Sequence, residues 1–309
     1  MLRLGRLNDD NLLDVAAVGF GTNSVSVMLS STGGPNPPVE YPVLHGGRED
    51  LEVADVTGDG RDDLIVMSGQ TYASPNFSVL AQLASGGFAS PVEYRVGEGI
   101  LTSGIGVGDV TGDGRNDVVA SYEGLAVFAQ TPLGTLSEPT IYPTDNGAKP
   151  VEVVDVNLDS RPDVVTAHNS SNVVGVYLQQ PDGSLASEDE YGIPVAQVGP
   201  HSLAVGDING DGAPDVVIAD RAHGLVVLYN TLPEQTNGSS SADAETGSSA
   251  TVPEPDRSCR PGTEPMTMCK GGGRSAPESS DGRRARSARA ERARRPENGL
   301  TWLYSAIRW

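Results

Sequence analysis

The sequence predicts an all-β fold built from a structural unit that recurs about five times along the chain. Three observations carry this prediction. The chain has 38 Gly and 22 Pro among 309 residues, which indicates many turns and few long helices. Residues 1–230 are rich in Val and Leu in alternating patterns typical of strands. An Asp-rich segment also returns at near-regular intervals, which is the mark of a repeat architecture.

The Asp-rich segments align without gaps, each with a loop followed by β-branched residues. They read VADVTGDGRDDLIV (53–66), VGDVTGDGRNDVVA (107–120), VVDVNLDSRPDVVT (153–166) and VGDINGDGAPDVVI (205–218), and a degraded copy reads GRLNDDNLLDVAAV (5–18). The last Asp residues of the five copies lie 49, 54, 46 and 52 residues apart. A repeat of this length has room for four short strands, and such units are typical of propeller blades.

A second signature recurs once inside each interval and ends in a tyrosine. Its copies read GGPNPPVEYPV (33–43), GGFASPVEYRV (86–96), GTLSEPTIYPT (134–144) and GSLASEDEYGI (183–193), with Tyr41, Tyr94, Tyr142 and Tyr191. In one repeat we expect strands at 151–155, 163–167 and 172–178 and a short strand around Tyr191. We therefore predict an all-β fold, a β-propeller of about five four-stranded blades.

The chain changes character near residue 232. Residues 1–230 hold nine Lys and Arg against 31 Asp and Glu, a net charge of −22, whereas residues 231–309 have a net charge of +2. The second part is rich in Ser, Gly, Pro and Glu at its start, a composition that cannot bury enough apolar surface to offset the entropy of ordering. We predict a propeller domain at 1–232 and a low-complexity, mostly disordered tail at 233–309. The tail is either functional or an artefact of the reading frame.

The Asp-rich loops have the spacing of a calcium site. Over nine residues they share the pattern D-x-[TN]-x-D-[GS]-x-x-D, with side-chain oxygens at positions 1, 3, 5 and 9. Hard oxygen ligands in this arrangement suit Ca²⁺, and three carboxylates so close together would repel one another without a cation. We predict about four structural calcium sites, with the ligands Asp55, Thr57, Asp59 and Asp63; Asp109, Thr111, Asp113 and Asp117; Asp155, Asn157, Asp159 and Asp163; and Asp207, Asn209, Asp211 and Asp215.

Two other interpretations of these loops are weaker. An EF-hand needs Glu at position 12, where this chain has Val66, Ala120, Thr166 and Ile218, and an EF-hand exits into a helix rather than a strand. A bare hairpin turn would need one Asp, not three at ligand spacing.

The loops are not expected to be equal. Loop 155–163 has Leu158 and Ser160 at positions 4 and 6, so we expect a weaker site there. Loop 6–14 has Arg6 in place of the first ligand, which makes calcium binding doubtful.

These loops and their following strands resemble the FG-GAP/VCBS repeat family, whose blades build integrin-α-like propellers. The resemblance covers roughly residues 5–230. It implies structural Ca²⁺ in the hairpin between the first two strands of each blade. It also implies a role in extracellular adhesion, ligand binding or carriage of another domain, although related calcium propellers include some polysaccharide lyases, so the fold does not settle the function.

The chain departs from this family in its number of blades. Family propellers usually have seven blades, and this chain supplies about five. The sequence starts inside the first Asp loop and its last copy ends at residues 225–230. We therefore expect the first blade to lack most of its first strand and the last blade to lack its fourth. Either five blades close through a complementary strand, from missing blades or another chain, or the chain is a truncated fragment; we favour the fragment, because open sheet edges are a liability.

Several classes of function are disfavoured. The net charge of −20 argues against nucleic-acid binding, and no run of 18 apolar residues could span a membrane. No signal peptide is visible. No nucleophile elbow, zinc-protease motif or P-loop is present. The four histidines, which we interpret as solvated turn residues, lie in separate connections: His45, His168, His201 and His223.

From the resemblance we expect a binding or adhesion module without catalytic activity, extracellular or at the cell surface, with an unknown protein or glycan as partner. A calcium-dependent carbohydrate-active enzyme, similar to a polysaccharide lyase, or a fragment of one, is the alternative. A third hypothesis is a remnant without a stable fold.

Overall fold

The structure is a computed structural model, and it contains two compact units, one formed by 1–233 with 285–309 and the other by 234–284. The second unit lies outside the described residues, as do Cys259 and Cys269 of the tail. The described residues are 1–19, 21–43, 50–67, 76–97, 102–122, 124–144, 148–168, 171–193, 203–220, 224–231, 291–292 and 302–307.

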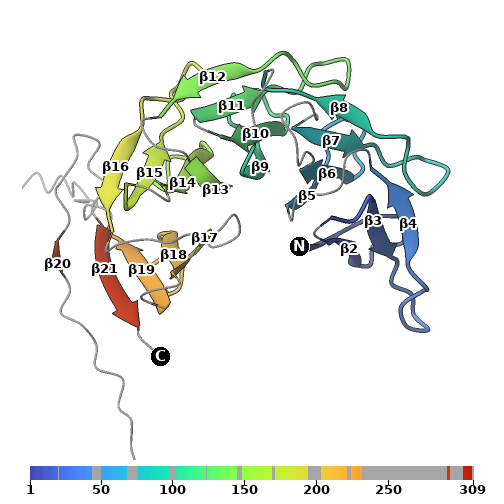
Figure 1. The fold of residues 1–309 in the computed structure, drawn as a ribbon, viewed down its shortest axis with the longest axis horizontal. Coiled ribbons are helices and arrows are strands. Elements are labelled where there is room, and N and C mark those ends of the chain that lie inside the picture. Colours follow the sequence, from blue (N-terminus) through green and yellow to red (C-terminus); the bar gives the residue numbers. More distant parts are fainter. Residues whose placement is uncertain are drawn as a thin grey trace, which may run out of the picture. The chain divides into compact units, whose positions relative to one another are not determined.

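The first unit contains five antiparallel sheets, each formed by strands that follow one another in the sequence (Figure 1). The first sheet holds β1 (Leu2–Gly5), β2 (Asp14–Val18), β3 (Ser24–Met28) and β4 (Val39–Pro42). The second holds β5 (Leu51–Ala54), β6 (Asp63–Met67), β7 (Phe77–Leu80) and β8 (Val92–Tyr94). The third holds β9 (Gly104–Gly108), β10 (Asp117–Ser121), β11 (Gly124–Phe128) and β12 (Thr140–Pro143). The fourth holds β13 (Ala148–Val154), β14 (Asp163–His168), β15 (Val173–Tyr177) and β16 (Asp189–Gly192). The fifth holds β17 (Leu203–Gly206), β18 (Asp215–Asp220), β19 (Gly224–Asn230), β21 (Trp302–Ile307) and β20 (Glu291–Arg292).

The five sheets are the blades of a β-propeller. Their first strands neighbour one another in the order β1, β5, β9, β13 and β17, and in each blade the chain then runs outward strand by strand. No helix occurs among the described residues, and none of them could therefore cross a bilayer as a helix. The predicted all-β propeller fold is confirmed.

Two expectations about the ends of the repeat array were wrong. The first blade has its first strand, because Leu2–Gly5 precede the Asp loop and pair with β2. The last blade has a fourth strand, because β21 pairs with β19 from Leu225↔Ile307 to Asn230↔Trp302. This strand comes from residues 302–307, within the segment assigned to the tail. The rest of the predicted disordered tail, apart from 291–292, lies outside the described residues.

The apolar core lies between the blades rather than within any one of them. Four clusters of buried side chains join sheets one and two, two and three, three and four, and four and five. The middle strand β6 is therefore buried along its whole length, since Leu64 and Val66 face the first sheet's cluster while Ile65 and Met67 face the third sheet's. The strand β2 of the first blade buries every second residue instead. Sheets covered on both faces read as continuous apolar runs.

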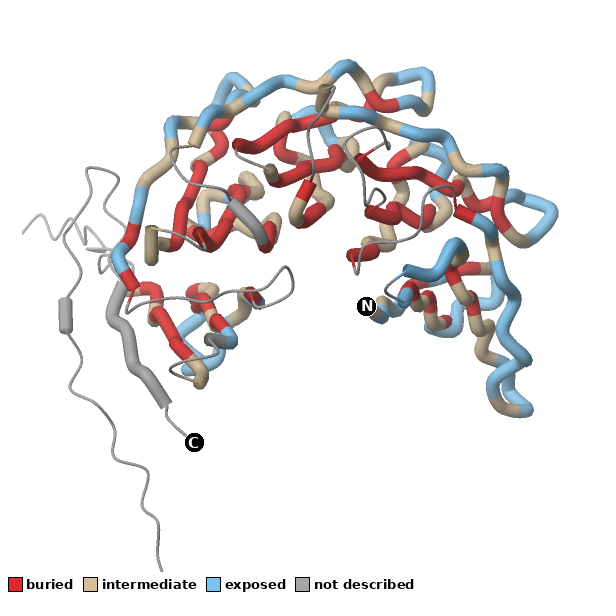
Figure 2. Tube along the Cα trace, viewed as in Figure 1, coloured by how far each residue is buried: buried red, intermediate tan, exposed pale blue. Residues whose placement is uncertain are grey.

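The tyrosines of the second signature lie on or beside the outer strands, which are largely exposed at β4, β8 and β12 (Figure 2). The hydroxyl oxygen of Tyr142 accepts a hydrogen bond from the backbone N–H of Leu185 in the next blade at 3.2 Å. Tyr94 accepts one from Leu136 in the same way at 3.4 Å. In these two blades the recurring tyrosine therefore links the outer strand to the turn of the following blade.

Candidate metal centre

Each Asp-rich loop forms the hairpin between the first and second strands of its blade. Position 1 directly follows the first strand, and position 9 is the first residue of the second strand, as in Asp109 after β9 and Asp117 at the start of β10. All five loops thus occupy the same place in their blades, including the degraded loop 6–14 between β1 and β2. The sequence repeat and the structural repeat coincide.

The aspartate at position 1 holds the turn of the loop together. Asp55 Oδ1 accepts a hydrogen bond from the backbone N–H of Gly58 at 2.6 Å, and its Oδ2 accepts one from Gly60 at 2.7 Å. Asp109, Asp155 and Asp207 accept the equivalent bond from position 6 at 2.7–2.9 Å. These bonds lower the pKa of the Asp207 carboxyl, with Gly212 as the main cause. In loop 207–215 these bonds therefore favour the carboxylate form of the first predicted ligand.

The aspartate at position 9 is fully buried in all five loops. Asp63 Oδ2 accepts bonds from the N–H groups of Val56 and Thr57, each at 3.0 Å, and its Oδ1 accepts one from Gln82 at 2.9 Å. Burial raises the pKa of Asp63 and Asp117 and that of Asp163 to about 7. Position 9 therefore anchors the loop to the blade, whether or not it also binds a cation.

Position 3 carries polar atoms without ordinary partners in two of the loops. The hydroxyl oxygens of Thr57 and Thr111 are buried, and neither has a hydrogen bond of ordinary geometry, although each hydroxyl lowers the pKa of the position 9 carboxyl in its loop. In the other two loops Asn157 and Asn209 donate to the carboxylate at position 5, both at 2.9 Å. A buried oxygen that lacks a partner is costly, and a cation would supply the missing one.

The aspartate at position 5 has an internal counter-ion in three loops. Arg61, Arg115 and Arg161, all at position 7, form ion pairs through Nη2 with Asp59, Asp113 and Asp159. Each guanidinium also donates through Nε to a backbone carbonyl at the end of the third strand. The sequence analysis gave the position 7 side chain no role and missed this ion pair. The fourth loop has Ala213 there and no such pair.

These contacts define how far the loops fit calcium. Among the described residues, no three His, Cys, Asp or Glu side chains are gathered closely enough to hold a metal ion as they stand. The donor set is nevertheless that of a hard cation, with two or three carboxylates and a hydroxyl or amide oxygen on one turn, and Thr57 and Thr111 keep buried oxygens unpartnered. The residue types are therefore those that Ca²⁺ uses, but their side chains would have to converge further to bind it.

Backbone conformation separates loop 155–163 from the others. Positions 4 and 6 adopt left-handed φ angles in all four complete loops, for example 74° and 82° at Gly58 and Gly60. In loop 155–163 the same angles, 58° and 68°, fall on Leu158 and Ser160. A side chain in this region costs about 1–2 kcal/mol per residue, which is the physical reason for expecting a weaker site here.

The degraded loop 6–14 keeps the turn but not the ligand set. Asp14 accepts hydrogen bonds from Leu7 and Ser30 as the other position 9 residues do, at 2.9 and 2.7 Å. Arg6 stands at position 1, and its backbone N–H donates to Asp62 of the second blade at 2.9 Å. This loop is therefore a structural hairpin.

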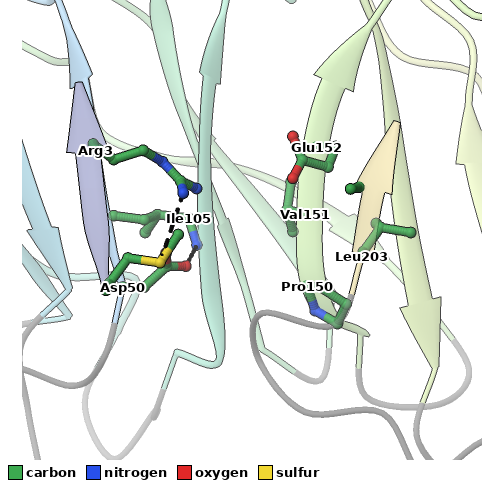
Figure 3. A pocket seen from close by; sticks show the side chains of 9 residues that line it. Arg3, Asp50, Ile105, Pro150, Val151, Glu152 and Leu203 are labelled. Atoms are coloured by element: carbon green, nitrogen blue, oxygen red, sulfur yellow. Dashed lines mark hydrogen bonds between the residues drawn. The ribbon is translucent and has the colours of Figure 1, made fainter. Parts of the chain in front are cut away.

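A second polar cluster lies where the first strands meet. A cavity of about 170 Å³ is lined by residues of all five blades, among them Arg3, Asp50 and Glu152 (Figure 3). Arg3 donates through Nε to both carboxylate oxygens of Glu52 at 3.0–3.1 Å. Burial raises the pKa of Asp50 and of Glu152, each to about 7. The cluster places three carboxylates around one guanidinium.

The one described histidine is not a solvated turn residue, contrary to the expectation. His168 is fully buried at the end of β14, and its Nε2 lies 2.5 Å from Glu188 Oε1. The absence of a side chain at Gly175 makes room for this pair, because a Cβ there would lie 1.7 Å from Glu188 Oε1. His45, His201 and His223 lie outside the described residues.

The fold and the repeated loop define a β-propeller with one Asp-rich hairpin in each blade. Residues 109–166 and 155–218 match the sequence profile of the FG-GAP-like repeat. Two consecutive repeats of the chain are thus similar in sequence to the FG-GAP-like repeat. No curated protein matches the chain in sequence.

Similar solved structures have low sequence identity to this chain. A crystal structure of BBS1N in complex with ARL6DN, soaked with mercury, is 15% identical with a TM-score of 0.46, over 73% of this chain and 62% of that one. The Vibrio cholerae (V. cholerae) biofilm matrix protein Bap1 is 17% identical with a TM-score of 0.43, over 74% of this chain and 36% of that one. A Photorhabdus luminescens Tc holotoxin pore structure is 12% identical with a TM-score of 0.36, over 74% and 12%. The chain spans less than two thirds of the length of each.

Proposed function

We propose that the chain is a calcium-stabilised propeller module that binds a protein or glycan ligand outside the cell and has no catalytic activity. The observation that carries the calcium part is the pair of buried hydroxyl oxygens, Thr57 Oγ1 and Thr111 Oγ1, which have no hydrogen bond of ordinary geometry inside loops rich in carboxylates. A cation at each loop would satisfy these oxygens.

Each complete loop would hold Ca²⁺ through the side chains at positions 1, 3, 5 and 9. The bound ion would supply positive charge and additional oxygen coordination, and it would cross-link the start and the end of the hairpin. Residues 1–230 carry a net charge of −22, so four bound ions would relieve a large self-repulsion. Because the ligands converge only in the folded hairpin, calcium binding would stabilise the native state.

The proposed role in binding follows from the resemblance to propellers that carry ligand or adhesion sites. Extracellular calcium, which is millimolar, would fill even sites as weak as those of extracellular modules. No contact among the described residues favours the carbohydrate-active enzyme over a binding module. The binding role is tested by a glycan array combined with a product assay on polyanionic polysaccharides, where binding without turnover supports the proposal and turnover overturns it.

The calcium part is tested by thermal unfolding of the full chain in excess EGTA, in 10 mM Mg²⁺ and in 10 mM Ca²⁺. A site filled to a hundred times its Kd adds about 2.7 kcal/mol, so several such sites would raise the Tm by roughly 10 °C or more. A cooperative transition at the same temperature in EGTA and Ca²⁺ would overturn the calcium proposal.

A pair of matched variants tests whether the calcium-induced rise in Tm comes from the Asp loops. Asp211→Asn removes one loop carboxylate that has no arginine partner, and we expect a smaller calcium-induced rise in Tm. Asp182→Asn removes an equal charge from an exposed turn outside the loops, where Asp182 accepts a hydrogen bond from the Ser184 hydroxyl. For this variant we expect the full calcium-induced rise in Tm. Equal responses of the two variants would show that calcium acts through general charge screening.

A further inference from the structure

At each of the four junctions between neighbouring blades, a side-chain amide of the later blade forms a hydrogen bond to the Asp loop of the earlier one. Its N–H₂ group donates to the backbone carbonyl at position 1 or 2 of that loop. The four bonds are Gln82 Nε2 to Arg6 O at 2.9 Å, Asn116 Nδ2 to Asp55 O at 3.1 Å, Gln179 Nε2 to Asp109 O at 2.7 Å and Asn230 Nδ2 to Val156 O at 2.6 Å.

The residue that supplies this amide is also hydrogen-bonded to the loop of its own blade. The backbone N–H of Gln179 donates to Asp163 Oδ1 at 2.8 Å, and its carbonyl accepts a bond from Arg161 Nε at 3.1 Å. Gln179 thus connects position 9 of its own loop to position 1 of the preceding loop, Asp109. The backbone N–H groups of Gln82 and Asn230 donate the same bond to the position 9 carboxylates of their loops, each at 2.9 Å.

A second contact joins the Asp loop to the following blade, this time to the turn between the third and fourth strands of that blade. The turn before the outer strand of the fourth blade places Gly183 against the position 3 carbonyl of the preceding loop. A Cβ on Gly183 would lie 2.1 Å from Thr111 O, and one on Gly134 would lie 2.5 Å from Thr57 O. Positions 1 and 3 of each of these loops are therefore both held by the blade that follows.

We propose that these amide side chains couple adjacent calcium loops, so that occupancy of one loop strengthens calcium binding at the loop before it. This inference rests on the calcium binding proposed above and adds its regulation. Gln82, Asn116, Gln179 and Asn230 act as positioning residues, because their amide N–H₂ groups bind the backbone of the preceding loop.

The coupling would pass through consecutive hydrogen bonds from loop 155–163 to loop 109–117. A cation in loop 155–163 fixes the Asp163 carboxylate, which fixes the backbone of Gln179, whose amide then fixes the carbonyl of Asp109. The carboxylate of Asp109 is the first ligand of its own loop and needs no further ordering when its cation arrives. Coupling of this kind is reciprocal, and typical values change affinity by about 5- to 150-fold; we expect the low end, about fivefold.

The test needs a reporter for each loop, and the residue at position 6 supplies one. The N–H groups of Gly60, Gly114, Ser160 and Gly212 donate to the position 1 carboxylates of their own loops. Their chemical shifts, followed by NMR while Ca²⁺ is titrated into the full ¹⁵N-labelled chain, give one binding curve for each loop.

The main experiment is a double-variant cycle. Asp155→Asn weakens loop 155–163, and we expect the midpoint of the Gly114 curve to rise about fivefold, although Asp155 is no part of that loop. In the Gln179→Met background the Gly114 midpoint is already raised, and Asp155→Asn should move it no further. A merely structural role of Gln179 would lower the Tm but would leave the effect of Asp155→Asn on Gly114 intact.

The chain contains a matched control for this cycle. Gln130 stands at the same point of its blade as Gln179 and makes the same backbone bonds, to Asp117 Oδ1 and from Arg115 Nε. Its Nε2, however, has no hydrogen-bond partner in the described part of the chain. We therefore expect Gln130→Met to leave the Gly60 curve unchanged, whereas Asn116→Ala, which removes the amide that serves this junction, should raise its midpoint.

The outcomes separate the two proposals. If Ca²⁺ shifts none of the four reporter signals, the proposed calcium function is overturned, and the coupling with it. If the signals shift but Asp155→Asn and Gln179→Met act independently on Gly114, only the coupling is overturned. If Gln179→Met does not fold, the partly exposed Asn116 replaces it, with Asp109→Asn as the loop variant and Gly60 as the reporter; there too, additive effects overturn the coupling.

Discussion

Loop 207–215 differs from the other three complete loops at two points, although all four share one pattern of acidic residues. Its position 7 is Ala213, where the others have an arginine that pairs with the aspartate at position 5. Its position 2 residue, Ile208, is 52% exposed, whereas Val56, Val110 and Val156 are buried against the next blade. Loops with the same acidic pattern can therefore be in two different electrostatic states, with or without an arginine counter-ion.

The comparison teaches that ligand spacing and ligand availability are separate properties. In the three arginine loops the position 5 carboxylate already has a counter-ion, so a metal must displace a guanidinium. In loop 207–215 the Asp211 carboxylate is bonded only to neutral donors of its own loop. We therefore expect loop 207–215 to bind calcium without this competition.

The largest effect is expected at position 9, where loop 207–215 and the arginine-containing loops should behave alike. Position 9 is fully buried in both, and Asp163 and Asp215 each accept backbone N–H bonds from the loop and from the third strand. Asp163→Ala and Asp215→Ala would each leave buried N–H groups unpaired, at a cost of about 3 kcal/mol. Urea unfolding in EGTA measures this, and a loss below about 1 kcal/mol would show that position 9 serves only the metal.

Backbone strain provides the next largest effect. Replacing Leu158 and Ser160 by glycine relieves two left-handed side chains, and we expect the double variant to raise the free energy of unfolding by about 1–2 kcal/mol in EGTA. The reverse change, Gly210→Ala with Gly212→Ala, should lower it by a similar amount, because these residues have φ angles of 79° and 88°. If the glycine variant is no more stable, strain is not what sets loop 155–163 apart.

The buried carboxylates at the first strands make the stability of the fold depend on pH. Burial, together with the charge of Glu52, raises the pKa of Glu152 to about 7, so the folded state holds this proton more tightly than the unfolded chain. The stabilisation is complete below about pH 4 and is lost as the pH rises to about 7.

We therefore expect Glu152→Gln to raise the free energy of unfolding by about 1 kcal/mol at pH 8 and to change little at pH 4.5. Urea unfolding at the two pH values, in EGTA, measures the difference. An equal effect at both values would mean that Glu152 remains ionised throughout.

The smallest expected effect is the change in calcium affinity when the position 7 arginine is added to one loop or removed from another. Ala213→Arg would give loop 207–215 the guanidinium of its neighbours, and Arg161→Ala would remove it from loop 155–163. Because such partly exposed ion pairs contribute about 0–1 kcal/mol, calcium affinity should fall by up to about fivefold in the first variant and rise by as much in the second. The NMR signals of Gly212 and Ser160 follow each loop, and a rise in affinity for Ala213→Arg would contradict the competition.

The sequence predicted the repeated features well because they are local. An Asp loop and the strand that follows it occupy 14 consecutive residues, so the spacing of Asp109, Thr111, Asp113 and Asp117 could be recognised directly. Their placement in the hairpin between the first two strands, which the family resemblance implied, agrees with the structure.

What could not be predicted depends on contacts between distant segments. The amide of Gln179 meets the carbonyl of Asp109 across 70 residues, and β21 joins β19 across a segment of unrelated composition. The glutamines at the ends of the third strands recur at matching positions, which is the signal that an alignment of the repeats beyond the Asp loops would have found.

The placement of the apolar clusters has a consequence for how such a chain changes in evolution. Each apolar cluster is made by two neighbouring sheets. When a repeat is duplicated or lost, the structural feature that must be preserved is therefore the packing between two sheets rather than a single sheet. Adding a whole repeat creates one new junction and leaves the existing ones intact, as expected for arrays governed by nearest-neighbour interfaces. Substitutions in a middle strand such as β6 act on two junctions at once, so we expect these strands to vary more slowly than the outer ones.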